Sequence, residues 1–219
     1  LQWLMGLAAM LTLPVYVASF DWVADLLRTL QPSPEGYRAF NAARYGVAIA
    51  VMVPASFFAG TTLPLITRIL IATGSGERAI GLVYGLNTLG SIAGVALAGL
   101  VLLPVLGLEW LLLFGAGLDM ALGVWLLAHT PSRRRVPVPA LGTALIGLVA
   151  VVGLGWAVQL DRNRLTAGVF RTGRIPTDEQ REILFYRDGR TATVSASRSL
   201  PDSSVALATN GKPDASLRA

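Results

Sequence analysis

A glycine-rich apolar run between residues 81 and 99 constrains this chain more than any other feature. It reads Gly-Leu-Val-Tyr-Gly-Leu-Asn-Thr-Leu-Gly-Ser-Ile-Ala-Gly-Val-Ala-Leu-Ala-Gly and contains no charged residue. In a soluble helix each glycine would cost about 0.5–1 kcal/mol relative to alanine. In hydrocarbon, glycine allows a neighbouring helix to approach closely. The spacings of four and five residues predict that one side of a membrane helix carries the packing residues Gly81, Gly85, Gly90, Gly94 and Gly99.

Composition also indicates a membrane protein. Hydrophobic residues make up 53% of the 219 residues and charged residues only 14%, whereas soluble domains contain about 25% charged residues. Residues 1–160 carry eight basic and six acidic side chains, and the shorter stretch 161–219 carries ten and seven. We therefore divide the chain into a transmembrane domain (1–160), a linker (161–180) and a polar tail (181–219).

Five apolar segments are long enough to cross a bilayer, whose hydrocarbon core of about 30 Å requires about 20 helical residues. The segment 61–70 is too short to cross again, and we expect it to continue the preceding helix or to lie in the interface. The short connection after residue 103 predicts an antiparallel hairpin. The five predicted spans are 2–20, 40–58, 80–103, 107–128 and 138–160.

The tail changes from helical to strand periodicity. Polar and small apolar residues alternate strictly over residues 191–197, which is typical of a half-buried strand. The pairs Asp188-Gly189 and Asn210-Gly211 are hairpin signals, and apolar runs at 183–186 and 205–209 adjoin them. The predicted fold class is therefore mainly α: a polytopic transmembrane helix bundle followed by a small antiparallel β-meander of three strands.

Three of the polar residues inside the predicted spans are candidate sites. Asn87 and Thr88 lie among the glycines, and they predict hydrogen bonds to a neighbouring helix, with contact to a substrate or ion as the alternative. Asp119 is a carboxylate at membrane depth with no basic residue near it in sequence, which makes it a candidate functional residue. With no cysteine and one histidine, the chain shows no metal-ligand pattern.

Several motifs of this chain resemble the bacterial membrane-fused spermidine synthase-like proteins. In the membrane part the similar segments are 54–65, 81–90 and 103–107, and in the tail they are 184–194 and 207–216. The resemblance implies a polyamine aminopropyltransferase, which moves an aminopropyl group from decarboxylated S-adenosylmethionine to an amine such as putrescine. It also implies a location in the bacterial inner (cytoplasmic) membrane.

The resemblance places Tyr186, Asn210 and Lys212 at the mouth of the active site, by position alone. The family's catalytic part is a Rossmann-like domain, so we expect this chain to be a fragment that holds the last membrane helices and the first strands. On its own it is expected to have no catalytic residue and to bind no cofactor. Its expected partners are the lipid bilayer and the remainder of the protein or partner membrane subunits, and not nucleic acid.

A non-enzymatic membrane subunit or a transporter-like bundle is the alternative, in which Asn87 and Asp119 would matter more than the tail. The arginines bear on orientation in either case. Five of them, at 68, 78 and 133–135, are expected on one side, and seven, at 28, 38, 44, 162, 164, 171 and 174, on the side of the tail. The positive-inside rule then favours a cytoplasmic tail.

Overall fold

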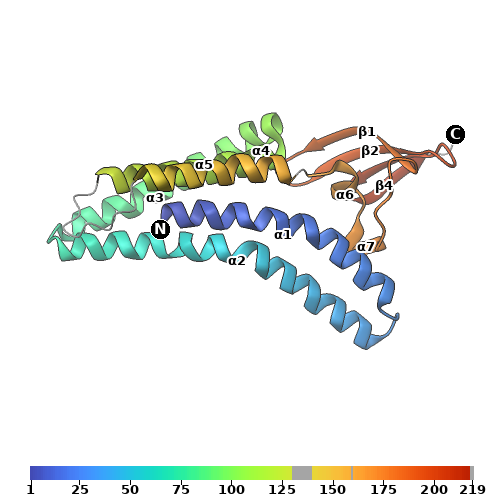
Figure 1. The fold of residues 1–219 in the computed structure, drawn as a ribbon, viewed down its shortest axis with the longest axis horizontal. Coiled ribbons are helices and arrows are strands. Elements are labelled where there is room, and N and C mark those ends of the chain that lie inside the picture. Colours follow the sequence, from blue (N-terminus) through green and yellow to red (C-terminus); the bar gives the residue numbers. More distant parts are fainter. Residues whose placement is uncertain (130–139, 159, 218–219) are drawn as a thin grey trace.

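A computed structural model of the chain describes residues 1–129, 140–158 and 160–217. It is mostly helical, with a four-stranded antiparallel sheet at one end of the helices (Figure 1). The arginines at 133–135 lie outside the described residues. The long helices are α1 (Gln2–Thr29), α2 (Pro34–Ala72), α3 (Gly76–Leu97), α4 (Leu103–His129) and α5 (Ala140–Ala157), and a π-helix (Ala98–Leu102) joins α3 to α4.

Three helical segments of the described chain are long and apolar enough to cross a membrane: α1, α2 and the continuous stretch Gly76–His129. The last has 54 residues, but its backbone leaves helical geometry at Gly107 (φ 77, ψ 174). At this end of the bundle the chain reverses from α3 into α4 (Figure 1). The fifth predicted span corresponds to a shorter apolar helix, Gly142–Ala157. Helices able to span a membrane are therefore present, and the number of five spans stays a prediction.

Helix α2 is longer than the sequence predicted. It begins at Pro34, directly after Ser33, whose hydroxyl accepts a hydrogen bond from the Gly36 N–H at 3.0 Å. It continues through the segment 61–70, so the first of the two alternatives for that segment is confirmed. The helix tolerates Pro54 and Pro64 in its interior and bends along its length (Figure 1).

Helix α1 lies at the centre of the molecule and contributes to both hydrophobic cores. Its first half packs against α4 and α5, and its second half packs against the segment that follows Leu160. The first core contains Met10, Leu13, Leu113, Ala116 and Met120. The second core contains Phe20, Val23, Ala24, Ala167 and Val169. One long helix therefore connects the membrane part to the region of the sheet.

The sheet consists of β1 (Arg181–Asp188), β2 (Thr193–Ser199), β3 (Val205–Thr209) and β4 (Lys212–Leu217), paired in chain order. The predicted meander is confirmed, including the Asn210-Gly211 turn, where both residues have positive φ (49 and 72). The prediction of three strands was wrong, because the sheet has four. The fourth strand, β4, lies at the edge of the sheet, where the missing N–H of Pro213 can be tolerated.

The two faces of the sheet differ in burial. One cross-strand row joins Tyr186, Ser195 and Ala208, and the last two are only 1% and 6% exposed. The next row joins Phe185, Ala196, Leu207 and Ala215, where Phe185 is 50% and Leu207 45% exposed. The first face packs on the helical part of the chain, and the second face is open.

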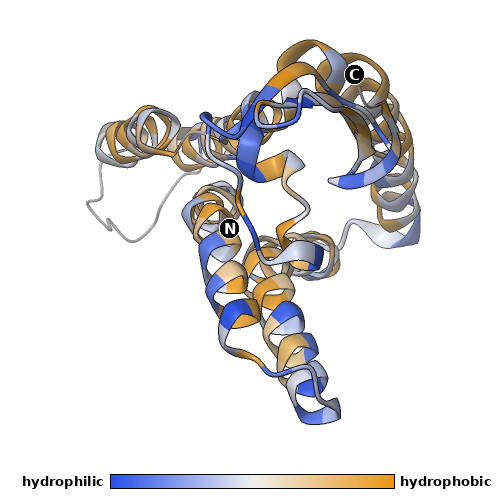
Figure 2. Ribbon diagram, turned by 90° about the vertical axis from the view of Figure 1, so that its right-hand side faces the viewer, coloured by the Kyte–Doolittle hydropathy of each residue, from blue (hydrophilic) through white to orange (hydrophobic). Residues whose placement is uncertain are grey.

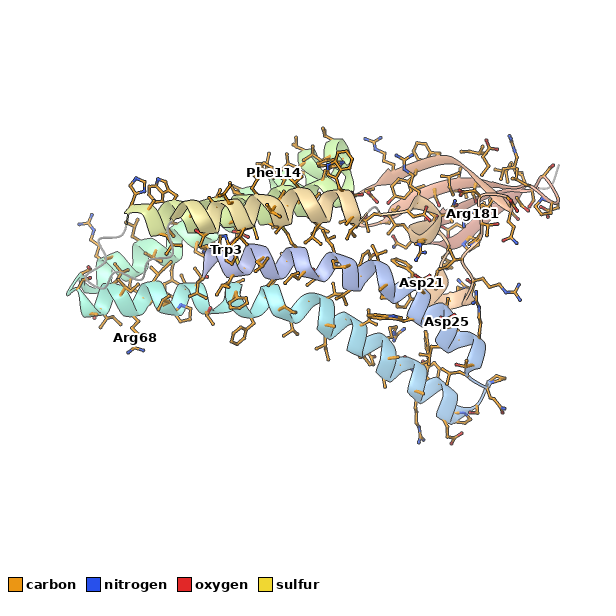
Figure 3. The ribbon with its side chains drawn as sticks, viewed as in Figure 1. Trp3, Asp21, Asp25, Arg68, Phe114 and Arg181 are labelled. Carbon is orange, nitrogen blue, oxygen red and sulfur yellow. The ribbon has the colours of Figure 1, made fainter. Side chains whose placement is uncertain are left out.

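Charged side chains gather at the two ends of the helices. Asp21 and Asp25 lie at the end near the sheet, and Arg68 lies at the opposite end (Figure 3). Viewed from the sheet, hydrophilic residues also mark the arm formed by the end of α1 and the start of α2 (Figure 2). From Glu109 to His129 the 20-residue rise of α4 is about 30 Å, which matches a bilayer core. Asp119 is halfway along this stretch.

Candidate functional site

The segment 161–180, expected to be a linker, folds against the long apolar helices. It forms α6 (Arg162–Thr166) and α7 (Val169–Thr172), and its residues Ala167 and Val169 are buried against α1 in the second core. The Arg164 guanidinium donates to Asp21 of α1 at 2.5 Å. This segment thus holds the sheet at a defined place on the bundle.

Arg181 joins the first strand to α6. Its guanidinium donates to the carbonyl oxygen of Thr166 at 3.3 and 3.2 Å and to the Thr166 hydroxyl at 2.5 Å. Burial lowers the pKa of Arg181. A planar guanidinium suits such a multiple contact, and lysine would not reproduce it.

Asp188, the last residue of β1, joins the sheet to α4. Its carboxylate accepts hydrogen bonds from the Leu108 N–H at 3.2 Å, the Tyr186 hydroxyl at 2.7 Å and the Thr193 hydroxyl at 2.8 Å. Burial, followed by the hydrogen bond and the negative charge of Asp188, raises the pKa of Tyr186. Tyr186 is therefore a neutral donor, and the acceptor oxygens of Asp188 are occupied.

The three residues predicted by resemblance, Tyr186, Asn210 and Lys212, line one cavity. This junction cavity has a volume of about 320 Å³ and lies between α1, α7 and the turn that connects β3 to β4. Cavities of this size hold small molecules. Its walls include the aromatic residues Tyr16 and Phe20 of α1. Proximity of the three residues is thus shown, and their role toward an amine substrate stays a prediction.

The charged side chains that line the junction cavity are both positive. Arg171 and Lys212 line it, both are exposed, and neither belongs to an ion pair within the described residues. No aspartate or glutamate is among its described lining residues. The Arg162 guanidinium lies over the ring of the lining residue Tyr186, 5.6 Å from the ring centre. Such a cavity favours an anionic ligand over a cationic amine.

The polar residues predicted inside the membrane have different surroundings. On α3, the Thr88 hydroxyl donates to the main-chain carbonyl of Tyr84 at 3.0 Å. The Ser91 hydroxyl donates to the main-chain carbonyl of Asn87 at 2.8 Å. These bonds stay within the helix. On α4, Asp119 is half-buried beside Gly6, where a Cβ would lie 3.2 Å from the Asp119 Cβ. In the part of the chain that the structure describes, Asp119 has no hydrogen bond or ion pair.

The glycines of α3 do not contact another helix of the described chain. A Cβ at Gly81, Gly85, Gly90 or Gly94 would have no atom within 4 Å, and one at Gly99 would lie 3.1 Å from the Arg190 side chain. The expectation that all five glycines share one side of the helix is also wrong, because of their helical spacing. Nine residues of an α-helix rotate by about 900°, so Gly90 and Gly94 lie opposite Gly81 and Gly85. Packing of these glycines against a further helix stays a prediction.

Close helix contacts instead involve glycines that the sequence analysis did not select. A Cβ at Gly6 of α1 would lie 2.8 Å from Met120, and one at Gly123 of α4 would lie 2.7 Å from the Cβ of Trp3. Next to this contact, the Trp3 indole donates to the Thr143 carbonyl of α5 at 3.2 Å. The available signal was weaker than in the third run: the first apolar run has one glycine, Gly6, and the fourth run has four.

Comparison with known proteins adds no relative: no protein-family model matches the sequence, and no curated protein or solved structure matches it.

Proposed function

We propose that this chain is the membrane anchor and the opening β-sheet of a spermidine synthase-like protein of the bacterial inner membrane. One observation carries the proposal: the sheet is fixed to the membrane helices on one face and is open on the other. Asp188 and Arg181 hold the inner face through their bonds to Leu108 and Thr166. The open face, with exposed Phe185 and Leu207, is then available to a catalytic domain.

The proposal includes five membrane spans, formed by α1 to α5, with the sheet in the cytoplasm. The charges at the two ends of the helices support it, because each helix would then have an apolar stretch between two polar boundaries. A cytoplasmic sheet is also where a cytosolic cofactor would meet the protein. The position of Arg68, at the end of the helices opposite the sheet, supports this sidedness.

In this proposal the chain contributes attachment and a platform, and catalysis belongs to a Rossmann-like domain. Decarboxylated S-adenosylmethionine needs a nucleoside pocket built from a βαβ unit, and the four described strands are all antiparallel. We therefore expect residues 1–219 alone to neither bind this cofactor nor transfer an aminopropyl group.

The test is aminopropyl transfer from labelled decarboxylated S-adenosylmethionine to putrescine by the native protein in its membrane. Transfer that decreases when Phe185 and Leu207 are both replaced by serine would support the open face as the docking surface. Replacement of the exposed Leu11 and Leu118 of the helices by alanine is the control. No transfer to any amine by the native protein would overturn the proposal.

Asp119 favours one alternative, a non-enzymatic transporter-like bundle. An unpaired carboxylate halfway along a membrane helix is expensive and marks ion or proton paths in many membrane proteins. The protein reconstituted into liposomes would then move protons or cations, measured with a pH-sensitive dye, and Asp119→Asn would abolish the movement. An Asp25→Asn variant, changed at an exposed pair outside the apolar part, is the matched control.

A further inference from the structure

We propose that the junction cavity binds the phosphate group of an anionic phospholipid. The inference does not depend on aminopropyl transfer, because such a site would serve any membrane protein with this bundle. If it holds, Lys212 and Asn210 contact a lipid headgroup rather than an amine substrate.

The position of the cavity along the helices is the first argument. Phe20 of α1 lines it and directly precedes Asp21, the first charged residue of that helix. Leu108 of α4 lines it too and directly precedes Glu109. On both helices the apolar stretch thus ends at the cavity. This is the level at which the headgroups of a bilayer lie and at which aromatic residues such as Tyr16 are enriched.

The available charge is the second argument. Arg171 and Lys212 are two exposed cations of the cavity without an ion pair in the described chain. Of the nearby carboxylates, Asp21 is paired with Arg164 at 2.5 Å. Asp188 keeps its negative charge, but its oxygens accept hydrogen bonds from the lining residues Leu108, Tyr186 and Thr193. Two cations that line the cavity, with no carboxylate among its described lining residues, attract a phosphate group.

The backbone that brings these cations together is the third argument. Gly168, just before α7, and Gly211, just before Lys212, both have positive φ (62 and 72). A Cβ on Gly211 would lie 2.5 Å from the Gly168 nitrogen and 2.6 Å from its Cα. Only glycine at both positions allows the β3–β4 turn to touch the start of α7. This contact places Lys212 and Arg171 on the same cavity.

The apolar part of the cavity selects a lipid over free phosphate. Phe20 and Val169 are buried, and Phe170 is half-buried, among its lining residues. A free phosphate ion would gain nothing from them, whereas the glycerol and the first methylene groups of a phospholipid would bury apolar area there. The volume of about 320 Å³ suits the head region of a lipid whose chains continue along α1.

The experiment measures lipid retention by native mass spectrometry of the detergent-purified chain. Phosphatidylglycerol and phosphatidylcholine are added in parallel at low salt. We expect phosphatidylglycerol to bind preferentially and the double variant Arg171→Ala/Lys212→Ala to bind it about thirtyfold more weakly, as two cations at a lipid surface predict. The matched control is Arg174→Ala/Arg187→Ala, which removes two arginines outside the cavity.

Three outcomes would overturn the inference. Equal retention of the two lipids would show that phosphate charge is not recognised. Equal weakening in the control variant would show a general surface effect. Displacement of phosphatidylglycerol by millimolar inorganic phosphate, with phosphate itself retained by the lipid-free protein, would assign the site to a soluble anion. Unchanged thermal unfolding of both variants verifies that they are folded.

Discussion

The carboxylate of Asp188 caps a helical turn of α4 that is 80 residues away in sequence: it accepts a hydrogen bond from the Leu108 N–H at 3.2 Å. Leu108 follows Gly107, where the chain leaves helical geometry, so its N–H is one of the free donors of a new helical turn. A negative charge at a helix start also complements the helix dipole. The sheet and α4 therefore stabilise each other.

We expect Asp188→Ala to loosen the sheet from the bundle. The change leaves the Leu108 N–H and the Tyr186 hydroxyl, both of half-buried residues, without their acceptor, and a fully buried group left in this way would cost about 1–3 kcal/mol. Hydrogen exchange measured by mass spectrometry should accelerate over residues 181–217 and change little in α2. Asp202→Ala, in an exposed loop, is the control, and equal exchange in the two variants would contradict the capping role.

The contact of Gly6 with α4 predicts a size limit. Gly6→Val would place side-chain atoms against Met120 and the Ala116 carbonyl, and overpacking of this kind costs about 1–3 kcal/mol. The thermal midpoint in detergent should fall. Gly46→Val makes the same change on α2, where no atom lies within 4 Å, and should leave the midpoint nearly unchanged.

The glycine-rich helix gives a prediction about assembly. If α3 packs against a helix from outside this chain, Gly94→Leu will weaken the assembled protein without destabilising the isolated chain, because within the chain the position is open. Crosslinking in native membranes measures the first effect, and thermal unfolding of the purified chain measures the second. Full assembly with leucine at this position would rule out close packing there.

Tyr186 predicts a loss of stability at high pH. Its pKa is raised above the ordinary value of 10.0, so the folded state holds the phenol proton more tightly than the unfolded chain does. This contribution is fully present below pH 10.0 and is lost as the pH rises through the pKa of the folded state. Denaturant unfolding between about pH 9 and 11 should show a steeper decline for the wild type than for Tyr186→Phe, which does not ionise.

Single cysteines can test the orientation, because the chain has none of its own. Glu179→Cys lies near the sheet, and Ser75→Cys lies in the turn between α2 and α3 at the other end of the bundle; both positions are exposed. In intact cells, a membrane-impermeant maleimide should label the Ser75→Cys variant and leave the Glu179→Cys variant unlabelled until the cells are lysed. The reverse pattern would place the sheet in the periplasm.

Much of the secondary structure followed from local chemistry. Apolar length predicted where α1, α4 and α5 lie, because a membrane helix satisfies its backbone bonds within itself. Strict alternation and apolar runs predicted the strands, and β3 has the predicted bounds, Val205–Thr209. The Asn210-Gly211 turn needs two residues with positive φ, which these residue types adopt at little cost. The sequence did not predict the edge strand β4, which contains Pro213. Proline argues against a central strand but is tolerated in an edge strand, and only the order of the strands in the sheet shows that β4 lies at the edge.

The site was decided by contacts between distant segments. The resemblance placed Tyr186, Asn210 and Lys212 together, but the other side of their cavity comes from α1, at the opposite end of the sequence. Likewise, a glycine in an apolar helix does not show in the sequence whether another helix lies against it, and the packing of Gly6 and Gly123 rather than Gly90 depends on which helix lies next to which. The sequence by itself determined the helices, the turns and the polar tail, since each depends on neighbouring residues. Only the tertiary structure decided which faces meet, because that choice depends on the shapes of surfaces built from separate parts of the chain.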